Sequence, residues 1–101
     1  MNKGKIAYWL DKYNIWNFTI NDDLTVDVNG YVDLIKKGLT EIPIQFGRVS
    51  GSFFCYINNL TSLKGSHIYV SGDFICLDNR LKSWEGFLVI IGGRANCLNN
   101  F

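Results

Sequence analysis

The stretch VSGSFFCYINNLTSL, residues 49–63, decides the fold, because much of it recurs as VSGDFICLDNRLKSW, residues 70–84. Val49 and Val70 lie 21 positions apart, and so do the Gly, Phe, Cys, Asn and Leu residues that follow them. Less complete copies of the same pattern begin at Val28 and Ile91. A pattern that keeps its spacing without insertions predicts an internal repeat, V-x-G-x-F-x-C-x-x-N-x-L-x-x-L.

Each repeat unit alternates apolar and other residues over its first half, which predicts one short strand. The spacing of Asn58, Leu60 and Leu63 then predicts a turn and a bent return segment. A unit this short cannot bury its own apolar face, so neighbouring units must stack about 4.8 Å apart, Phe53 on Phe74. The sequence therefore predicts a mainly β, short-repeat solenoid with parallel strands, about three and a half coils over residues 28–101.

The segment F-x-C-x-x-N-x-L-x-x-L resembles the core of the leucine-rich repeat, with an aromatic residue and Cys replacing two leucines. Its full form is similar to short leucine-rich-repeat-like proteins that are common in bacteriophage genomes. The resemblance covers about residues 15–101 and implies a solenoid fold and a viral source, but no catalytic activity. The first unit departs from it, with Lys37 in the Asn position and Pro43-Ile44 in place of the later Lys64-Gly65.

Residues 1–27 lack the repeat and are expected to cap the first coil within one domain, 1–101. Apolar residues spaced three and four apart predict an amphipathic helix over Lys5–Tyr13. Phe18–Ile20 and Leu24–Val26 flank the turn-forming residues 21–23, which predicts a β-hairpin. We expect three aromatic side chains of this cap to cover the apolar edge of the first coil: Trp9, Trp16 and Phe18.

Composition excludes several classes of protein. The chain of 101 residues carries a net charge of +1 and is 48% hydrophobic, so it has no general attraction for nucleic acid and can build a core. Its apolar runs are too short for a membrane span or a signal peptide. With three cysteines, no CxxC and no signal, we expect no disulfide framework and a cytoplasmic location, in the host cell for a phage protein.

The residues that resemble chemical sites have structural explanations. Cys55, Cys76 and Cys97 occupy the position that Leu34 occupies in the first unit, which predicts buried core thiols. The asparagines at 58, 79 and 100 are expected to form a structural hydrogen-bond ladder. The single histidine, His67, is expected on the return segment without a catalytic partner. We therefore expect no catalytic residue, no metal site and no cofactor.

The strand positions between the inward residues must face outward, where no structural need explains them. Stacking brings six apolar side chains into one patch with polar margins, a combination typical of a protein-binding surface. The residues expected to contact a partner are Tyr31, Asp33, Ile35, Phe54, Tyr56, Asp73, Ile75, Leu77, Arg94 and Leu98.

The sequence thus favours a non-catalytic protein-binding module. If the phage resemblance holds, the partner is a host factor that the protein inhibits, such as a defence or nucleic-acid-processing enzyme. One alternative is nucleic-acid binding, with bases stacked on Tyr31, Phe54 and Tyr56, although the Lys and Arg residues are scattered. Another is a self-assembling structural protein. A homodimer through the fourth coil, residues 91–101, or through the apolar sheet is a further expectation.

Overall fold

The computed structural model describes residues 1–63, 67–82 and 88–100, which form two β-sheets and one short α-helix. The first sheet has five strands in the order β1-β2-β4-β6-β8, and the second has four in the order β3-β5-β7-β9. The strands of the first sheet are Phe18–Ile20, Val26–Val28, Phe46–Val49, His67–Val70 and Leu88–Ile91. Those of the second are Val32–Asp33, Phe53–Phe54, Phe74–Ile75 and Ala95–Asn96.

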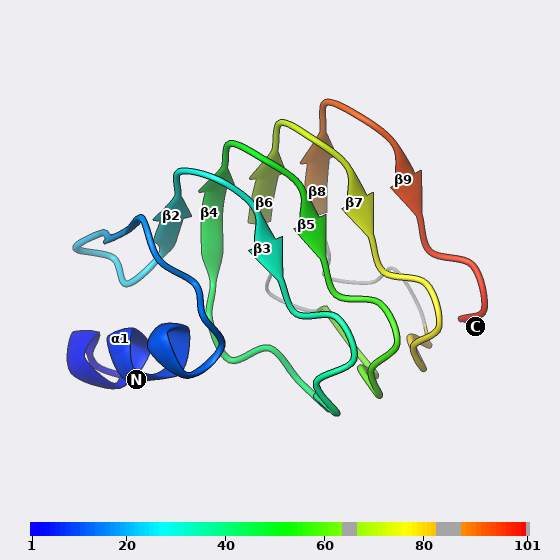
Figure 1. The fold of residues 1–101 in the computed structure, drawn as a ribbon, viewed down its shortest axis with the longest axis horizontal. Helices are drawn as coiled ribbons and strands as arrows, with labels where there is room; N and C mark the ends of the chain where they lie inside the picture. The colour runs from blue at the N-terminus through cyan, green and yellow to red at the C-terminus, as the bar shows by residue number, and fades with distance from the viewer. Residues whose placement is uncertain (64–66, 83–87, 101) are drawn as a thin grey trace.

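Strand pairing follows the sequence repeat. In the second sheet Phe53 pairs with Phe74, and in the first sheet Val49 pairs with Val70, all in parallel strands. The antiparallel pair is β1 with β2. Figure 1 shows the chain passing from a strand of the first sheet to a strand of the second, four times in succession. The prediction of a mainly β chain with parallel strands is confirmed, but the single strand predicted for each unit is wrong. Residues 50–52 bend between the sheets, so Val49 ends β4 of the first sheet and Phe53 begins β5 of the second.

The turn between the two sheets depends on glycine. A Cβ atom on Gly51 would lie 2.8 Å from the carbonyl carbon of Gly30, so no larger residue fits without a shift of the backbone. The Gly51 N–H donates to the Gly30 carbonyl oxygen at 2.8 Å, and the Gly72 N–H bonds Gly51 in the same way. Neighbouring units therefore approach each other closely at this position.

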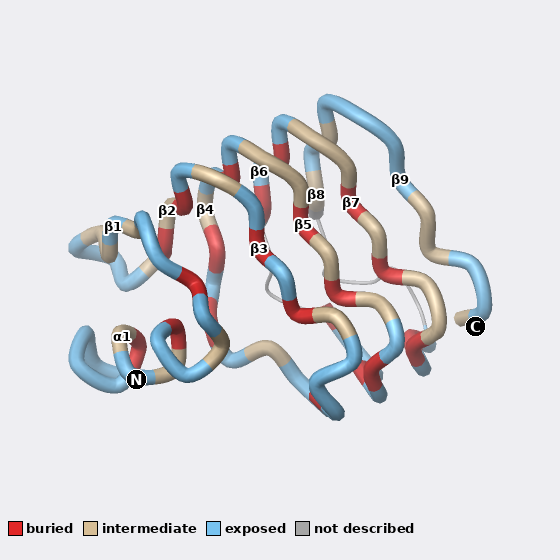
Figure 2. The backbone as a smooth tube through the Cα atoms, in the orientation of Figure 1, coloured by how far each residue is buried: buried red, intermediate tan, exposed pale blue. Residues whose placement is uncertain are grey.

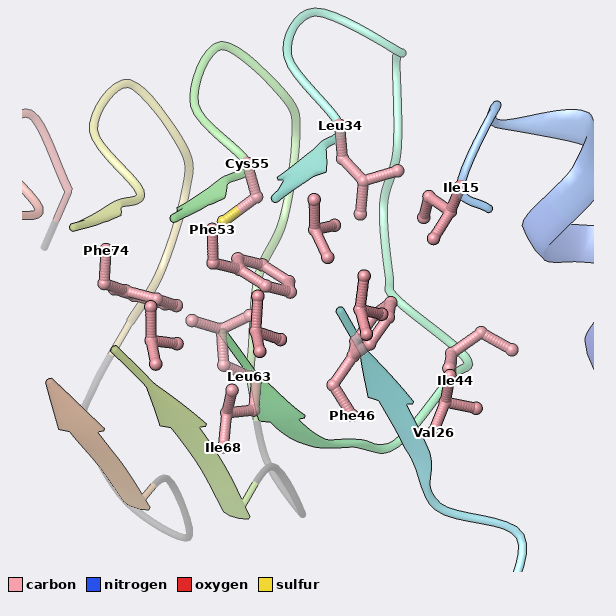
Figure 3. Close-up of a cluster of buried hydrophobic side chains, with 14 of the residues drawn as sticks. Ile15, Val26, Leu34, Ile44, Phe46, Phe53, Cys55, Leu63, Ile68 and Phe74 are labelled. Carbon is pink, nitrogen blue, oxygen red and sulfur yellow. The ribbon is translucent and has the colours of Figure 1, made fainter. Parts of the chain in front are cut away.

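The hydrophobic core lies between the two sheets (Figure 2). The ring centres of Phe46 and Phe53 are 5.3 Å apart, and those of Phe53 and Phe74 are 5.5 Å apart. Figure 3 shows these rings with Leu34 and Cys55 pointing into the same interior. The predicted inward positions at 53, 55, 60, 74 and 76 are all buried. Ala95 is different: it pairs with the buried Phe74 yet is exposed, because β9 is the last strand of its sheet in the described residues.

The asparagine ladder is confirmed. The Asn58 amide nitrogen donates to the carbonyl oxygens of Cys55 and Leu34, at 3.0 and 2.7 Å. Asn79 bonds Cys76 and Cys55 in the same manner, and both asparagine side chains are buried. Each amide thus closes its own turn and ties that turn to the preceding unit.

The helix α1 spans Lys3–Lys12, two residues earlier at its start than the sequence predicts. The Asn2 side chain accepts a hydrogen bond from the Lys5 N–H at 2.9 Å and so caps the N-terminus. Ile6 and Leu10 are the buried residues of this helix, which packs at the end of the sheets near the hairpin (Figure 1). Among the described residues no helix has the length and apolar character needed to cross a membrane.

The hairpin prediction is wrong in its second strand, which is Val26–Val28 and not Leu24–Val26. The Asp23 carboxylate accepts hydrogen bonds from the N–H and hydroxyl of Thr25, at 3.0 and 2.6 Å, and this holds the residues between the strands in a longer turn. Leu24 lies in that turn with φ 69°. The prediction for Trp16 is also wrong: its side chain is 62% exposed, and Ile15 fills the core beside the helix instead. Trp9 and Phe18 do pack against the core.

Three sequence predictions fall outside the described residues: the Lys64-Gly65 turn, the repeat position of Trp84, and Phe101. His67 is the first residue of β6 and pairs with Leu88, so it belongs to the first sheet and not to a loose return segment.

Candidate functional site: the apolar face of the second sheet

The outward residues of the second sheet stack in the predicted columns. Asp33 pairs with Phe54, Phe54 with Ile75, and Ile75 with Asn96. The next column is held by backbone bonds between units, from the Lys36 N–H to the Tyr56 carbonyl and from the Ile57 N–H to the Leu77 carbonyl, both 3.1 Å. These columns make one surface, here called the apolar face: Ile35, Phe54, Tyr56, Ile75, Leu77 and Leu98.

The apolar face is accessible. Leu98 is 68% exposed, and the other five residues of the face are half-buried, packed side by side on a solvent-facing surface. The rings of Phe54 and Tyr56 meet edge to face with centres 6.3 Å apart. Tyr31, at the margin, is 67% exposed. The structure therefore brings together the aromatic and aliphatic residues that the sequence placed on this surface.

A shallow groove of about 770 Å³ crosses one end of this face, over β7 and β9. Its walls include Ile75 and Leu98 from the apolar face, with Asp73 and Arg94 at its margin. An apolar floor with a charged margin matches the anatomy of protein interfaces, in which the centre loses water and the rim stays wet.

The polar residues of the margin are held by the backbone. The Asp73 carboxylate accepts a hydrogen bond from the Arg94 N–H at 2.8 Å, and the Asp73 N–H donates to the Ser52 hydroxyl at 2.9 Å. The Asp33 carboxylate accepts from the Ile35 N–H at 3.1 Å. Sequence reasoning missed these bonds, which give both aspartates a structural role in addition to their place on the margin.

Ile57, which follows Tyr56 in the chain, is an exposed apolar residue that sequence reasoning missed. Its φ is 56°, in the left-handed region, where a β-branched side chain is strained. The equivalent positions in the other units are Lys36, Asp78 and Asn99, all with φ near the same value and all polar. Ile57 is 44% exposed, so its apolar side chain is not explained by the core. Comparing the four units at this position was the signal that could have identified it.

The cysteines correct the sequence analysis. Cys76 and Cys97, at equivalent positions of adjacent units, form a disulfide, so the expectation of three free thiols is wrong for this pair. In-register stacking explains the bond, because it brings the two Cα atoms to 4.7 Å, within the range that a disulfide spans. Cys55 remains a buried thiol as predicted, and burial raises its pKa from 9.0 to about 12.

The described residues offer no cluster of three or more His, Cys, Asp or Glu side chains placed to hold a metal ion. Comparison with known proteins adds no functional assignment: no family model, no curated protein and no solved structure matches this chain.

Proposed function

We propose that this chain is a non-catalytic protein-binding module and that the apolar face recognises its partner. The observation that carries the proposal is the accessible surface of six stacked apolar residues on one sheet, with charged residues confined to its margin. Soluble monomers rarely leave contiguous apolar patches of this kind uncovered. An aromatic pair at the centre, Phe54 and Tyr56, is the kind of anchor on which protein interfaces depend.

We also propose that the chain is a leucine-rich-repeat-like solenoid of phage origin. Strand registers offset by 21 residues support a leucine-rich-repeat-like solenoid, since each unit supplies the same positions to both sheets. The resemblance of the repeat to short phage proteins supports a host protein as the partner, inhibited through occupation of its surface. The cytoplasmic location stays a prediction, and the disulfide removes the argument that all the cysteines are reduced.

The experiment compares three immobilised proteins in a bacterial lysate: the wild type, Leu77→Asp and Tyr8→Asp. Tyr8 is the matched control, because it is 74% exposed and lies on α1, outside the apolar face. We expect a protein retained by the wild type and by Tyr8→Asp but lost from Leu77→Asp. The retained protein, once purified, must bind in a defined ratio, and the complex must survive a rise in salt from about 0.1 to 1 M.

Two results would contradict the proposal. Binding that falls steeply with salt and depends on added nucleic acid would favour the nucleic-acid alternative. Equal retention by Leu77→Asp and the wild type would place recognition elsewhere. The other candidate to occupy the apolar face is a second copy of this chain. In that case light scattering over a dilution series shows a homodimer, and Leu77→Asp abolishes it.

A further inference from the structure

A second groove, of about 320 Å³, lies on the outer face of the first sheet, where β2, β4 and β6 adjoin the turns that follow them. Its walls include the polar residues Asp27, Asn29, Arg48, Ser50 and Tyr69, together with apolar surface from Val28 and Val49. The volume is at the lower end of the range for pockets that bind small molecules. None of these residues belongs to the apolar face.

The carboxylate in this groove is held in place by an irregularity of the sheet. Val26 pairs with Phe46 but Val28 pairs with Val49, so Gly47 and Arg48 together face Asp27. The Arg48 N–H donates to the Asp27 carboxylate at 2.8 Å, and a Cβ atom on Gly47 would lie only 2.6 Å from the same oxygen. Such bulges redirect side chains and recur beside functional sites.

The Arg48 guanidinium is the positive group in the groove, and a contact other than the one that holds Asp27 keeps it in place. The Arg48 guanidinium lies over the ring of Tyr69, 5.3 Å from its centre, which fixes the arginine side chain without using its N–H groups. Within the described residues Arg48 forms no ion pair with the neighbouring Asp27. The Tyr69 side chain is 46% exposed, so part of its surface remains open to a ligand.

The third polar group of the groove is the Asn29 amide, which Ser50 holds in place. The Ser50 hydroxyl accepts from the Gly30 N–H at 2.8 Å and donates to the Asn29 side-chain oxygen at 3.2 Å. These bonds orient the Asn29 amide, whose NH₂ group donates to no other residue in the described part of the chain. The groove thus presents fixed donors, on Arg48 and Asn29, beside a fixed acceptor, on Asp27.

We propose that this groove binds a small, uncharged, hydroxyl-rich ligand of the sugar class. An anion alone would meet the Asp27 carboxylate, a cation alone would meet the Arg48 guanidinium, and an apolar ligand would leave both charges without partners. Hydroxyl groups both donate and accept, so they satisfy all three side chains at once. The exposed part of the Tyr69 ring adds an apolar contact surface to the groove. The inference does not depend on the proposed protein-binding function.

The test follows backbone amide NMR shifts of the intact protein during titration with three probes: methyl α-glucoside, methyl β-galactoside and N-acetylglucosamine. We expect at least one to give saturable shifts concentrated at Asn29, Arg48 and Tyr69, and Arg48→Ala to weaken that binding about tenfold or more. Tyr69→Ala should weaken it as well, while the matched control Arg80→Ala, at an exposed arginine outside this groove, should not. The same spectra report whether each variant is folded.

The inference is overturned if none of the three sugars gives saturable shifts, or if both folded groove variants bind as the wild type does. Sodium phosphate, as an anion, and methylammonium chloride, as a cation, are titrated in parallel. Saturation of the groove by either ion, without sugar binding, would show a charge site and would equally overturn the assignment.

Discussion

The side-chain oxygen of Asn58 accepts a hydrogen bond from the backbone N–H of Leu39, 19 residues earlier, at 3.0 Å. The same relationship joins Asn79 to the Leu60 N–H and Asn100 to the Leu81 N–H, each at 3.0 Å. Each of these amides therefore satisfies backbone groups of two successive units, which fixes the position of one turn against the next.

The first prediction concerns this ladder. Asn79→Ala should lower the free energy of unfolding by about 1–3 kcal/mol, because it leaves buried backbone groups without partners. Chemical denaturation measures the loss. The control is Asn59, an exposed residue that follows the ladder residue Asn58, and Asn59→Ala should change stability by less than about 0.5 kcal/mol. Equal effects of the two substitutions would show that the ladder contributes nothing specific.

The second prediction concerns the strained residue Ile57. Ile57→Asn should raise the free energy of unfolding by about 1 kcal/mol, because Asn adopts the left-handed conformation at lower cost than a β-branched residue. Ile57→Val keeps the branch and should leave stability nearly unchanged. Chemical denaturation of the wild type and both variants measures the effect. A loss of stability in Ile57→Asn would mean that apolar contacts of Ile57 outweigh its backbone strain.

The third prediction concerns the thiol of Cys55. With the pKa raised from 9.0 to about 12 in the folded protein, its neutral form is favoured by folding. That stabilising contribution is complete below pH 9 and is lost as the pH rises toward 12, because the thiol of the unfolded chain ionises first. Stability measured over this pH range should fall more for the wild type than for Cys55→Ala. Parallel curves for the two proteins would contradict the buried-thiol account.

The fourth prediction concerns the disulfide. Reduction should lower the free energy of unfolding by about 3 kcal/mol, since the bond closes a loop between residues 21 positions apart. Denaturation with and without dithiothreitol measures the effect, and Cys97→Ala should be insensitive to the reductant. If dithiothreitol leaves the denaturation midpoint of the wild type unchanged, that result would argue against the Cys76–Cys97 bond.

The sequence predicted the structural features that recur in successive units. The spacing from Phe53 to Phe74 determines both the strand register and the inward direction of these rings, so the core and the outward columns followed from the pattern alone. The Asn ladder followed for the same reason, since a buried amide at each turn has to bond the turn beside it.

Features specific to one unit could not be derived in this way. The repeat aligns Cys76 equally with Cys55 and Cys97, so spacing alone does not select the pair that bonds. The shifted hairpin depends on local hydrogen bonds such as that from the Thr25 N–H to the Asp23 carboxylate, and Trp16, which is exposed, lies in the segment that lacks the repeat. The polar groove depends on a bulge between β2 and β4, which breaks the repeat at Gly47.

The most direct test of the protein-binding claim places a photo-crosslinking phenylalanine analogue at position 56, in the apolar face, or at position 8, on the helix. Irradiation in lysate should join one partner to the position-56 protein and not to the position-8 protein. Excess wild-type protein should suppress this product, whereas excess Leu77→Asp should not. Crosslinks of equal intensity from both positions, or a product that the wild type and Leu77→Asp suppress equally, would contradict recognition through the apolar face.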